Sequence, residues 1–281
     1  MKRFQVIQMT HLSRYDVAKF EQDGCLLPLT IMDEVDALEL RRQLEAAERF
    51  AGDDSRLKNA IKAGGNQVLP FLADLCRDPR ITDPVASVLG EDLLLWACSL
   101  FVKEPGSDSF ISWHQDVHYW GLEEASEVTA WLALSPATLE SGCMKFVPGS
   151  HKTRVAHRDT FAVDNMLTRG QEIAVEVDDA DTVEVNLRPG QMSLHHGLTF
   201  HASGPNRSAD RRIGIALRFV PTSNRQEGNV RTLATLARGE DRFGHFDLTP
   251  IPAAPFEPEA LERFERGQAL SRSILLRGAG M

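Results

Sequence analysis

The sequence predicts an α+β fold in which a jelly-roll barrel of antiparallel strands is flanked by helices. Three observations support this prediction. Apolar residues recur at helical spacing in the first third of the chain. From about residue 92, short β-prone runs alternate with Gly, Pro, Asn and Asp, which is typical of an antiparallel sandwich or barrel. After a proline-rich stretch the chain returns to a helical pattern, so helices precede and follow the strands.

We expect the 281 residues to form one domain, because no repeat, low-complexity tract or flexible linker divides the chain. Its parts are a mainly helical segment at 1–91, a jelly-roll core at 92–221 and a C-terminal extension with a helix at 222–281. A chain of this length with 42% hydrophobic residues can bury a substantial core.

The helical segment is expected to contain one long helix and two short ones. In "TIMDEVDALELRRQLEAAERFAG" two apolar stripes have helical spacing, namely Ile31, Val35 and Leu38, then Ala37, Leu40, Leu44 and Ala47. Gly52 follows where a C-cap is expected. The stretch "QVLPFLADLCRDPRITDPVASVLG" predicts two short helices broken at Pro79 and Pro84. The polar stretch at 54–69, with its paired glycines, is expected to be a mobile lid over the barrel mouth.

Strand-length runs bounded by turn residues follow. They are 93–102, 128–136, 144–150, 172–177, 182–187, 190–196 and 212–220. A closing helix is expected over "PEALERFERGQALSRSILL", after the proline-rich "LTPIPAAPFEP".

Composition excludes several classes of partner. The formal net charge is -9 and no run concentrates Lys and Arg, so a nucleic-acid groove or an anionic membrane surface is not expected. No apolar stretch approaches the roughly 18 to 20 residues of a membrane span. The opening "MKRFQVIQMTHLSRYD" lacks the apolar segment of a signal peptide. The four cysteines are scattered and form no CxxC pair, which is typical of reduced thiols in a cytoplasmic protein.

The first chemical motif lies in "SFISWHQDVHYWGL". His114 and Asp116 alternate along a predicted strand and therefore share one face. With a third ligand they would form the two-histidine, one-carboxylate triad that holds Fe(II) and leaves positions open for oxygen and an organic co-ligand. The alternative is a hydrogen-bonded surface pair, because an isolated HxD occurs often by chance.

A second motif lies in "PGQMSLHHGLTFHASGPNRSADRRIGIALRFVP", which supplies His195, His196 and His201. On the strand that follows, alternation places on one face Arg212, Gly214, Ala216 and Arg218. Two arginines separated by small residues are suited to line a cavity that binds an anion, since a guanidinium can bind both oxygens of a carboxylate. The alternative is an edge strand with solvated arginines, which leaves the small residues unexplained.

The segments "WHQD", "AWLALSPATLESGCMKFVPGSHK" and "HASGPNRSADRR" together resemble the phytanoyl-CoA dioxygenase family of Fe(II)- and 2-oxoglutarate-dependent oxygenases. The resemblance covers nearly the whole chain, including the opening "FEQDGCLLPLT", where a helix leads into a first strand. It implies a double-stranded β-helix, which is a cupin-like jelly roll, with iron ligands His114, Asp116 and His201.

The resemblance also implies four contacts with the co-substrate 2-oxoglutarate. Arg212 is expected to bind its far carboxylate, Ser203 lies two positions beyond the distal histidine, and Trp131 is expected to pack against it. Ser99 matches a co-substrate contact of the family by position only, because the residue type differs. His201 is preferred as the third ligand because "ASGPN" follows it.

The neighbouring histidines and aromatic residues have open roles. His196 is expected to shape the pocket from the preceding strand, whereas His195 is interpreted as an ordinary, partly buried histidine. His118, Tyr119 and Trp120 are interpreted as lid or substrate-pocket residues, with a purely structural role as the alternative.

The reaction implied by the resemblance is the oxidative decarboxylation of 2-oxoglutarate with O2, giving succinate and CO2, while an unactivated C–H bond is hydroxylated. Halogenating members have a small residue at the position of Asp116, so the carboxylate there favours hydroxylation.

The substrate is expected to be a small molecule. The central motifs most resemble the bacterial branch that includes hydroxylases of 2-aminoethylphosphonate. Arg218 could bind the phosphonate, and Tyr119 or Trp120 could contact the ammonium group by a cation–π interaction. Amino-acid derivatives and betaines would suit the same residues, whereas a long acyl-CoA fits less well because no basic cluster awaits its phosphates.

Two other classes of protein stay open. A cupin-like protein that binds zinc or manganese without oxygenase activity would keep the triad but would not need Arg212 and Trp131. A structural sandwich would have no metal dependence. Iron-dependent consumption of 2-oxoglutarate distinguishes the oxygenase from both.

Overall fold

The computed structural model describes residues 11–277, and its helices lie before and after most of the strands. The helices are α1 (Arg14–Asp23), α2 (Glu34–Ala51), α3 (Ser55–Val68), α4 (Pro70–Leu75), α5 (Pro79–Leu89) and α6 (Pro258–Leu275). Within this range no helix is both long and apolar enough to cross a membrane. The expected lack of a signal peptide concerns an N-terminal stretch that lies mainly outside the described residues.

The strands form a large sheet, a smaller sheet and a two-stranded pair. The large sheet contains, in spatial order, β1 (Cys25–Thr30), β9 (Gln191–His196), β4 (Val128–Ala133), β11 (Arg212–Pro221), β2 (Leu93–Lys103), β12 (Leu233–Arg238) and β13 (Asp247–Leu248). The smaller sheet contains β3 (Ile111–His114), β10 (His201–Ser203), β5 (Met144–Phe146) and β8 (Val183–Glu184), and the pair is β6 (His157–Arg158) with β7 (Glu172–Ile173).

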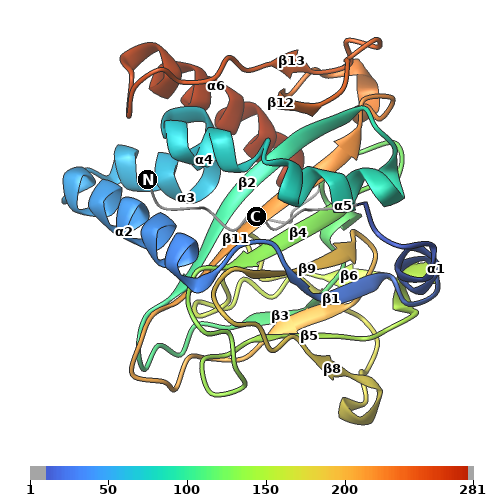
Figure 1. Cartoon of the computed structure of the whole chain (residues 1–281). Helices are drawn as coiled ribbons and strands as arrows, with labels where there is room; N and C mark the ends of the chain where they lie inside the picture. Colours follow the sequence, from blue (N-terminus) through green and yellow to red (C-terminus); the bar gives the residue numbers. More distant parts are fainter. Residues whose placement is uncertain (1–10, 278–281) are drawn as a thin grey trace.

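These sheets confirm the α+β class and its large antiparallel sheet. All pairings between the named strands are antiparallel except that of β12 with β13. Strand pairing across residues 11–277 does not close into a barrel, so the predicted barrel is seen only as separate sheets. Figure 1 shows α2, α3, α4 and α6 gathered beside β2 and β11, with β3, β5 and β8 away from these helices.

Strand β11 explains how the layers meet, because it lies in the middle of the large sheet and is buried on both faces. Ile213, Ile215 and Leu217 face the helices and belong to the main apolar core. On the opposite face, Ala216 packs with Trp131 in a second cluster. The interpretation of β11 as a solvated edge strand is therefore wrong.

The predicted long helix begins later than its pattern suggested. Asp33 caps α2 by accepting a hydrogen bond from the Asp36 N–H, so Ile31 precedes the helix. Val35 is 71% exposed and Leu38 is 42% exposed. The helix is instead buried along the second stripe, through Ala37, Leu44 and Ala47. Gly52 is the C-cap, as predicted.

One further helix prediction is wrong, and the expected mobility of the stretch at 54–69 stays a prediction. This stretch is helical: Asp54 caps α3, which packs against β2 and α6. Its Gly64 sits at a kink where an added Cβ would overlap the ring of Phe264. Pro79 starts α5 rather than breaking it, because a proline at the first helical position loses no hydrogen bond. Pro84 lies inside α5, whose apolar face is buried around it.

The observed strands differ from the predicted runs mainly in the exposed parts of the chain. The runs at 172–177 and 182–187 contribute only the two-residue strands β7 and β8. The strand expected around His114 is present as the short β3, whereas β10 and β12 were absent from the predicted runs because each is short or follows a polar turn. Both β3 and β10 carry chemically important residues.

Gly214 is expected to tolerate no side chain. A Cβ at this position would overlap the indole of Trp131, a rigid ring that is itself buried. We expect Gly214→Ala to lower the free energy of unfolding by about 1–3 kcal/mol, the usual cost of overpacking a core. Urea unfolding of the variant measures this loss.

Gly204→Ala is the matched control, because a Cβ there meets nothing within 4 Å and the backbone needs no left-handed conformation. Equal stability of the two variants would contradict close packing of Trp131 on β11.

Candidate metal centre and adjoining cavities

Three buried side chains with metal-binding atoms converge between the two sheets. They are His114, Asp116 and His201, and one ligand atom from each lies within 4.8 Å of the others. His114 ends β3 and is paired in register with His201 at the start of β10, which brings the ring centroids to 4.0 Å. Asp116 is not on the strand as predicted, because β3 ends at His114 and a 3-10 turn begins at Asp116.

Backbone carbonyls orient both imidazoles for metal binding. Nδ1 of His114 lies 2.9 Å from the Ser112 carbonyl oxygen, and Nδ1 of His201 lies 2.9 Å from that of Thr199. Each Nδ1 therefore donates to a carbonyl oxygen, and each Nε2 is the ring nitrogen available to a metal ion. Burial lowers the pKa of His201 well below its usual value, so this ring is neutral at physiological pH.

The two oxygens of Asp116 have different surroundings. Oδ1 lies 3.4 Å from Nε2 of His114. Oδ2 lies 3.3 Å from the hydroxyl of Thr129, 3.6 Å from Nε2 of His195 and 3.9 Å from Nε of Arg218. Burial alone would raise the pKa of Asp116, but Arg218 and the imidazoles outweigh it and hold the pKa well below the usual range. Asp116 is thus a carboxylate ready to bind a cation.

Strand register explains why three residues from distant segments reach Asp116. Thr129 of β4 lies opposite both His195 of β9 and Arg218 of β11. Residues directly opposite each other in a sheet share a face. These three side chains therefore form one row that crosses the large sheet beside Asp116.

His195 is not the ordinary, partly buried histidine that the sequence suggested. It is 1% exposed, and neither ring nitrogen has a hydrogen-bond partner in residues 11–277. Burial lowers its pKa, so the ring is neutral. His196 points the other way and accepts a hydrogen bond from the Leu198 N–H at 3.0 Å. The expected pocket-shaping role therefore fits His195 better than His196.

Glu127 is a buried acid that sequence reasoning missed. Burial and the charge of Asp116 raise its pKa well above the usual range, which favours the protonated form of this carboxyl. It lies 2.8 Å from the Thr129 hydroxyl, which also faces Asp116. The signal was available, because "EVTAWLA" places an acid and a threonine at the start of an otherwise apolar strand.

A narrow cavity adjoins the side chains of His114, Asp116 and His201 on the side of Arg212. Trp131, Ser203 and Arg212 line it. Arg212 is 1% exposed, and its Nε and Nη2 have no partner among the described residues. Burial lowers its pKa to about 10, so it stays charged. The cavity encloses ≈ 20 Å³, so entry of a larger ligand requires flexible lining side chains such as Met144 to rotate.

A second cavity of ≈ 700 Å³ opens on the other side of Asp116. It lies between α3, α6, β2 and β12, and the segment 166–171 closes one side. Its volume is within the range of pockets for drug-sized ligands. Ser99 faces this cavity rather than Arg212, and its hydroxyl accepts a hydrogen bond from Nη1 of Arg218 at 3.0 Å.

Tyr119 and Trp120 line the large cavity, but their rings are already covered. The guanidinium of Arg169 lies 4.0 Å from the centroid of the Tyr119 ring. Trp120 stacks on Trp96 at 4.7 Å and has Arg218 at 5.1 Å. His118 stacks on His157 beside them and lines neither cavity. Arg169 and Arg218 therefore occupy the positions over these rings where a substrate ammonium group was expected to make a cation–π contact.

Comparisons with known proteins agree with this geometry. The profile of the phytanoyl-CoA dioxygenase (PhyH) family matches residues 20–214. A phytanoyl-CoA dioxygenase from Arabidopsis thaliana is 30% identical over 62% of this chain and 63% of its own length. A Stutzerimonas stutzeri protein named "Probable alpha-ketoglutarate-dependent hypophosphite dioxygenase" is 31% identical over 62% of this chain and 60% of its own length.

The chain thus spans less than two thirds of the length of these relatives. Among solved structures, a non-heme monooxygenase described as ThoJ apo has a TM-score of 0.83 and 29% identity, and the match covers 93% of this chain and 97% of that one.

Loss of one side chain of the triad is expected to abolish iron binding without unfolding the protein. His114→Ala and Asp116→Ala each remove one of three convergent ligands. Anaerobic equilibrium dialysis against Fe(II), followed by metal analysis, should find stoichiometric iron in the parent and little in either variant. Circular dichroism checks the fold.

His118→Ala is the matched control, because it changes a histidine in the same turn that lies outside the cluster. Stoichiometric iron in Asp116→Ala, or its loss in His118→Ala, would contradict this assignment.

Proposed function

Because the chain belongs to the phytanoyl-CoA dioxygenase family, whose members are 2-oxoglutarate-dependent dioxygenases, we propose that it hydroxylates an unactivated C–H bond using Fe(II) and 2-oxoglutarate. One observation carries this proposal. A triad with two free imidazole lone pairs lies beside a cavity that ends at a buried, unpaired arginine. A metal centre alone would not need Arg212, whereas a co-substrate with a far carboxylate does.

Different residues of the chain would bind the iron and the 2-oxoglutarate. His114, Asp116 and His201 would hold the iron, and Thr129 and His195 can steady the second oxygen of Asp116. Such outer contacts fix the orientation of metal ligands. Arg212 binds the far carboxylate of 2-oxoglutarate, with Ser203 and Trp131 beside it.

Bound iron with 2-oxoglutarate supplies the oxidising chemistry that hydroxylates the substrate and releases succinate and CO2. The protein contributes a dry site, since all three side chains of the triad are less than 7% exposed. The large cavity on the other side of Asp116 gives the substrate a separate approach.

We also propose that the sheets form the double-stranded β-helix of the family. The triad comes from the smaller sheet and the turn after β3, whereas Trp131, His195 and Arg212 come from the larger sheet. Two sheets that enclose one centre between them are compatible with this fold.

The walls of the large cavity favour an anionic substrate. The cationic residues that line it are Lys62, Arg169, Arg218 and Arg272, whereas Asp116 is its one lining carboxylate within residues 11–277. Arg169 is paired with Asp159 outside the lining, and the remaining positive charge contrasts with the net charge of -9 of the whole chain. Arg218 lies nearest the triad, with its Nε 3.9 Å from Oδ2 of Asp116, and is suited to bind a phosphonate or carboxylate close to the reacting carbon.

The structure offers a binding partner for the phosphonate group of 2-aminoethylphosphonate but not for its ammonium group. Arg218 suits the phosphonate, and the Stutzerimonas relative is named for another phosphorus oxyacid. The ammonium half lacks a partner, because the rings of Tyr119 and Trp120 are covered by arginines. The same argument disfavours betaines. We therefore propose a small organic acid, and the ≈ 700 Å³ volume leaves room for one longer than an aminophosphonate.

The proposed activity predicts iron-dependent turnover of 2-oxoglutarate. Succinate should form when Fe(II), O2 and 2-oxoglutarate are supplied, and it should stop when a chelator is added. Arg212→Ala is expected to raise the KM for 2-oxoglutarate about 100-fold or more, since losing one partner of a buried charge pair costs on the order of 2–5 kcal/mol. Iron content should not change.

Arg207→Ala serves as the control, because this neighbouring arginine is exposed and pairs only with Asp108 among the described residues. Iron binding without any succinate would favour the cupin-like metal protein instead. An unchanged KM in Arg212→Ala would remove Arg212 from the co-substrate site.

The proposed substrate class predicts which compounds accelerate succinate formation. We expect 2-aminoethylphosphonate and propylphosphonate, which lacks the ammonium group, to stimulate turnover similarly, and propylamine to have no effect. The physical reason is that Arg218 can bind the anionic group, whereas none of the described residues that line the cavity offers a free partner for the ammonium group. Product analysis by mass spectrometry checks for an added oxygen. Stimulation by propylamine alone would contradict the anionic class.

A further inference from the structure

Lys103 carries a buried amine that the proposed function does not use. It ends β2, is 0% exposed and forms no ion pair with any carboxylate of residues 11–277. Its Nζ donates instead to neutral oxygens, namely the Ser203 hydroxyl at 2.7 Å and the carbonyls of Ser203 and Gly204. Burying an amine among neutral acceptors is costly, so the position of Lys103 requires a functional or structural explanation.

A buried cation lies directly opposite. Lys103 of β2 and Arg212 of β11 are paired in register and therefore share a face. Burial, and then the charge of Arg212, lower the pKa of Lys103 to about 6, so the amine is mainly uncharged at neutral pH until an anion binds nearby. The other titratable group that acts on Lys103 is Cys143, from the segment before β5, and burial raises the pKa of Cys143, so its thiol is neutral. The pair has no anion of its own.

An anion that would balance the charge beside Lys103 and Arg212 can be bound next to Ser203. The narrow cavity next to the triad is lined by both Ser203 and Arg212, whereas Lys103 lies behind Ser203 and does not reach the cavity itself. A carboxylate in the cavity can thus bind Arg212 directly and contact the charge of Lys103 only through the Ser203 hydroxyl. When Lys103 donates to Ser203 Oγ, the hydroxyl proton is free to point at that carboxylate.

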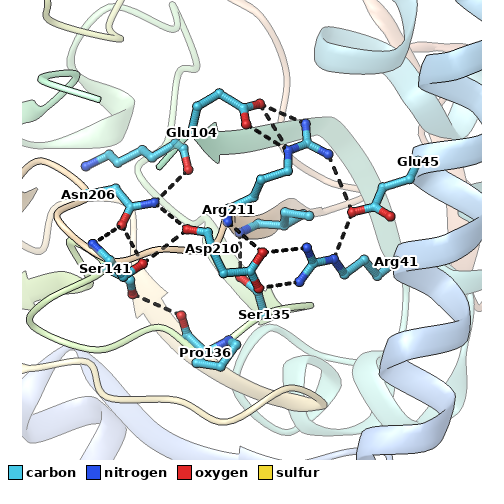
Figure 2. Close-up of polar contacts among 12 residues, drawn as sticks. Arg41, Glu45, Glu104, Ser135, Pro136, Ser141, Asn206, Asp210 and Arg211 are labelled. Carbon is cyan, nitrogen blue, oxygen red and sulfur yellow. Dashed lines mark hydrogen bonds and ion pairs between the residues drawn. The ribbon is translucent and has the colours of Figure 1, made fainter. Parts of the chain in front are cut away.

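The backbone around Lys103 is held rigidly. Nδ2 of the fully buried Asn206 donates to the Lys103 carbonyl at 2.9 Å and to the Asp210 carbonyl at 2.8 Å. Figure 2 shows Asp210 joined in turn to Arg41, and Arg211 joined to Glu104. These contacts fix the 204–211 segment, which connects Ser203 to Arg212, and tie it to α2.

We propose that Lys103 is a positioning residue of the co-substrate site, which orients the Ser203 hydroxyl so that Ser203 and Arg212 together bind the far carboxylate of 2-oxoglutarate. This inference rests on the proposed function and adds a residue to it. Lys103 touches no substrate, so its effect is restricted to ligands that carry the far carboxylate.

The test compares two ligands that differ only at that end. 2-Oxopentanoate has the keto acid and five carbons of 2-oxoglutarate but a methyl group in place of the far carboxylate. Anaerobic titration of the Fe(II)-loaded protein, followed by the visible absorption of the chelate, gives a Kd for each without turnover. Lys103→Met keeps the volume of the side chain and removes its hydrogen bonds and charge.

We expect Lys103→Met to raise the Kd for 2-oxoglutarate about 10-fold or more and to leave that for 2-oxopentanoate within twofold, since breaking a charge-assisted hydrogen bond costs about 1.5–3 kcal/mol. The kcat at saturating 2-oxoglutarate should be nearly unchanged. Adding Ser203→Ala to Lys103→Met should cost little more, because both act through one hydroxyl.

Lys145→Met is the matched control, since Lys145 lies beside Ala202 in the same sheet but faces solvent and pairs with Asp179. If Lys103→Met does not fold, Ser203→Ala alone must show the same selective loss. Equal losses for both ligands, an unchanged Kd for 2-oxoglutarate, or additive losses in the double variant would overturn the proposal. A parent protein that forms no chelate with 2-oxoglutarate would overturn the proposed function as well.

Discussion

A buried arginine without an internal counter-ion is the constraint on which the rest of this structure depends. Arg212 and Lys103 lie at one end of the inner face of the large sheet and Arg218 lies at the other, and each is less than 9% exposed. Asp116 pairs with Arg218, whereas Nε and Nη2 of Arg212 have no partner in residues 11–277. An anionic ligand beside Arg212 would supply the missing charge.

The two faces of strand β11 are chemically distinct, one apolar and one carrying Arg212 and Arg218. Its apolar face packs against the helices, while Gly214 and Ala216 leave room for Trp131 between the two arginines. Side chains of intermediate size at these positions would fill the cavity face. In the proposed function, this strand therefore places co-substrate binding near Arg212 and substrate binding near Arg218.

The sequence predicted the elements that depend on local pattern. Alternation placed Arg212 and Arg218 on one face, and the family resemblance of "WHQD" and "HASGPNRSADRR" implied the three convergent side chains. It missed His195, Thr129 and Lys103 because their importance comes from register between strands far apart in the chain. Alternation reveals which face a residue occupies, but not which residue lies opposite.

Other errors have equally physical causes. The stretch at 54–69 is polar enough for a loop, yet capping by Asp54 and packing on β2 and α6 make it helical. The rings of Tyr119 and Trp120 were assigned to a substrate cation because Arg169 and Arg218 come from other segments and were not known to cover them. Tertiary contacts of this kind leave no periodic signal.

An anaerobic crystal structure with Fe(II) and 2-oxoglutarate, recorded at the iron absorption edge, tests the central claim most directly. The account predicts an anomalous peak bound by His114, Asp116 and His201, with the far carboxylate of 2-oxoglutarate on Arg212 and Ser203. An iron atom bound through His195, or a carboxylate that leaves Arg212 unpaired, would contradict it.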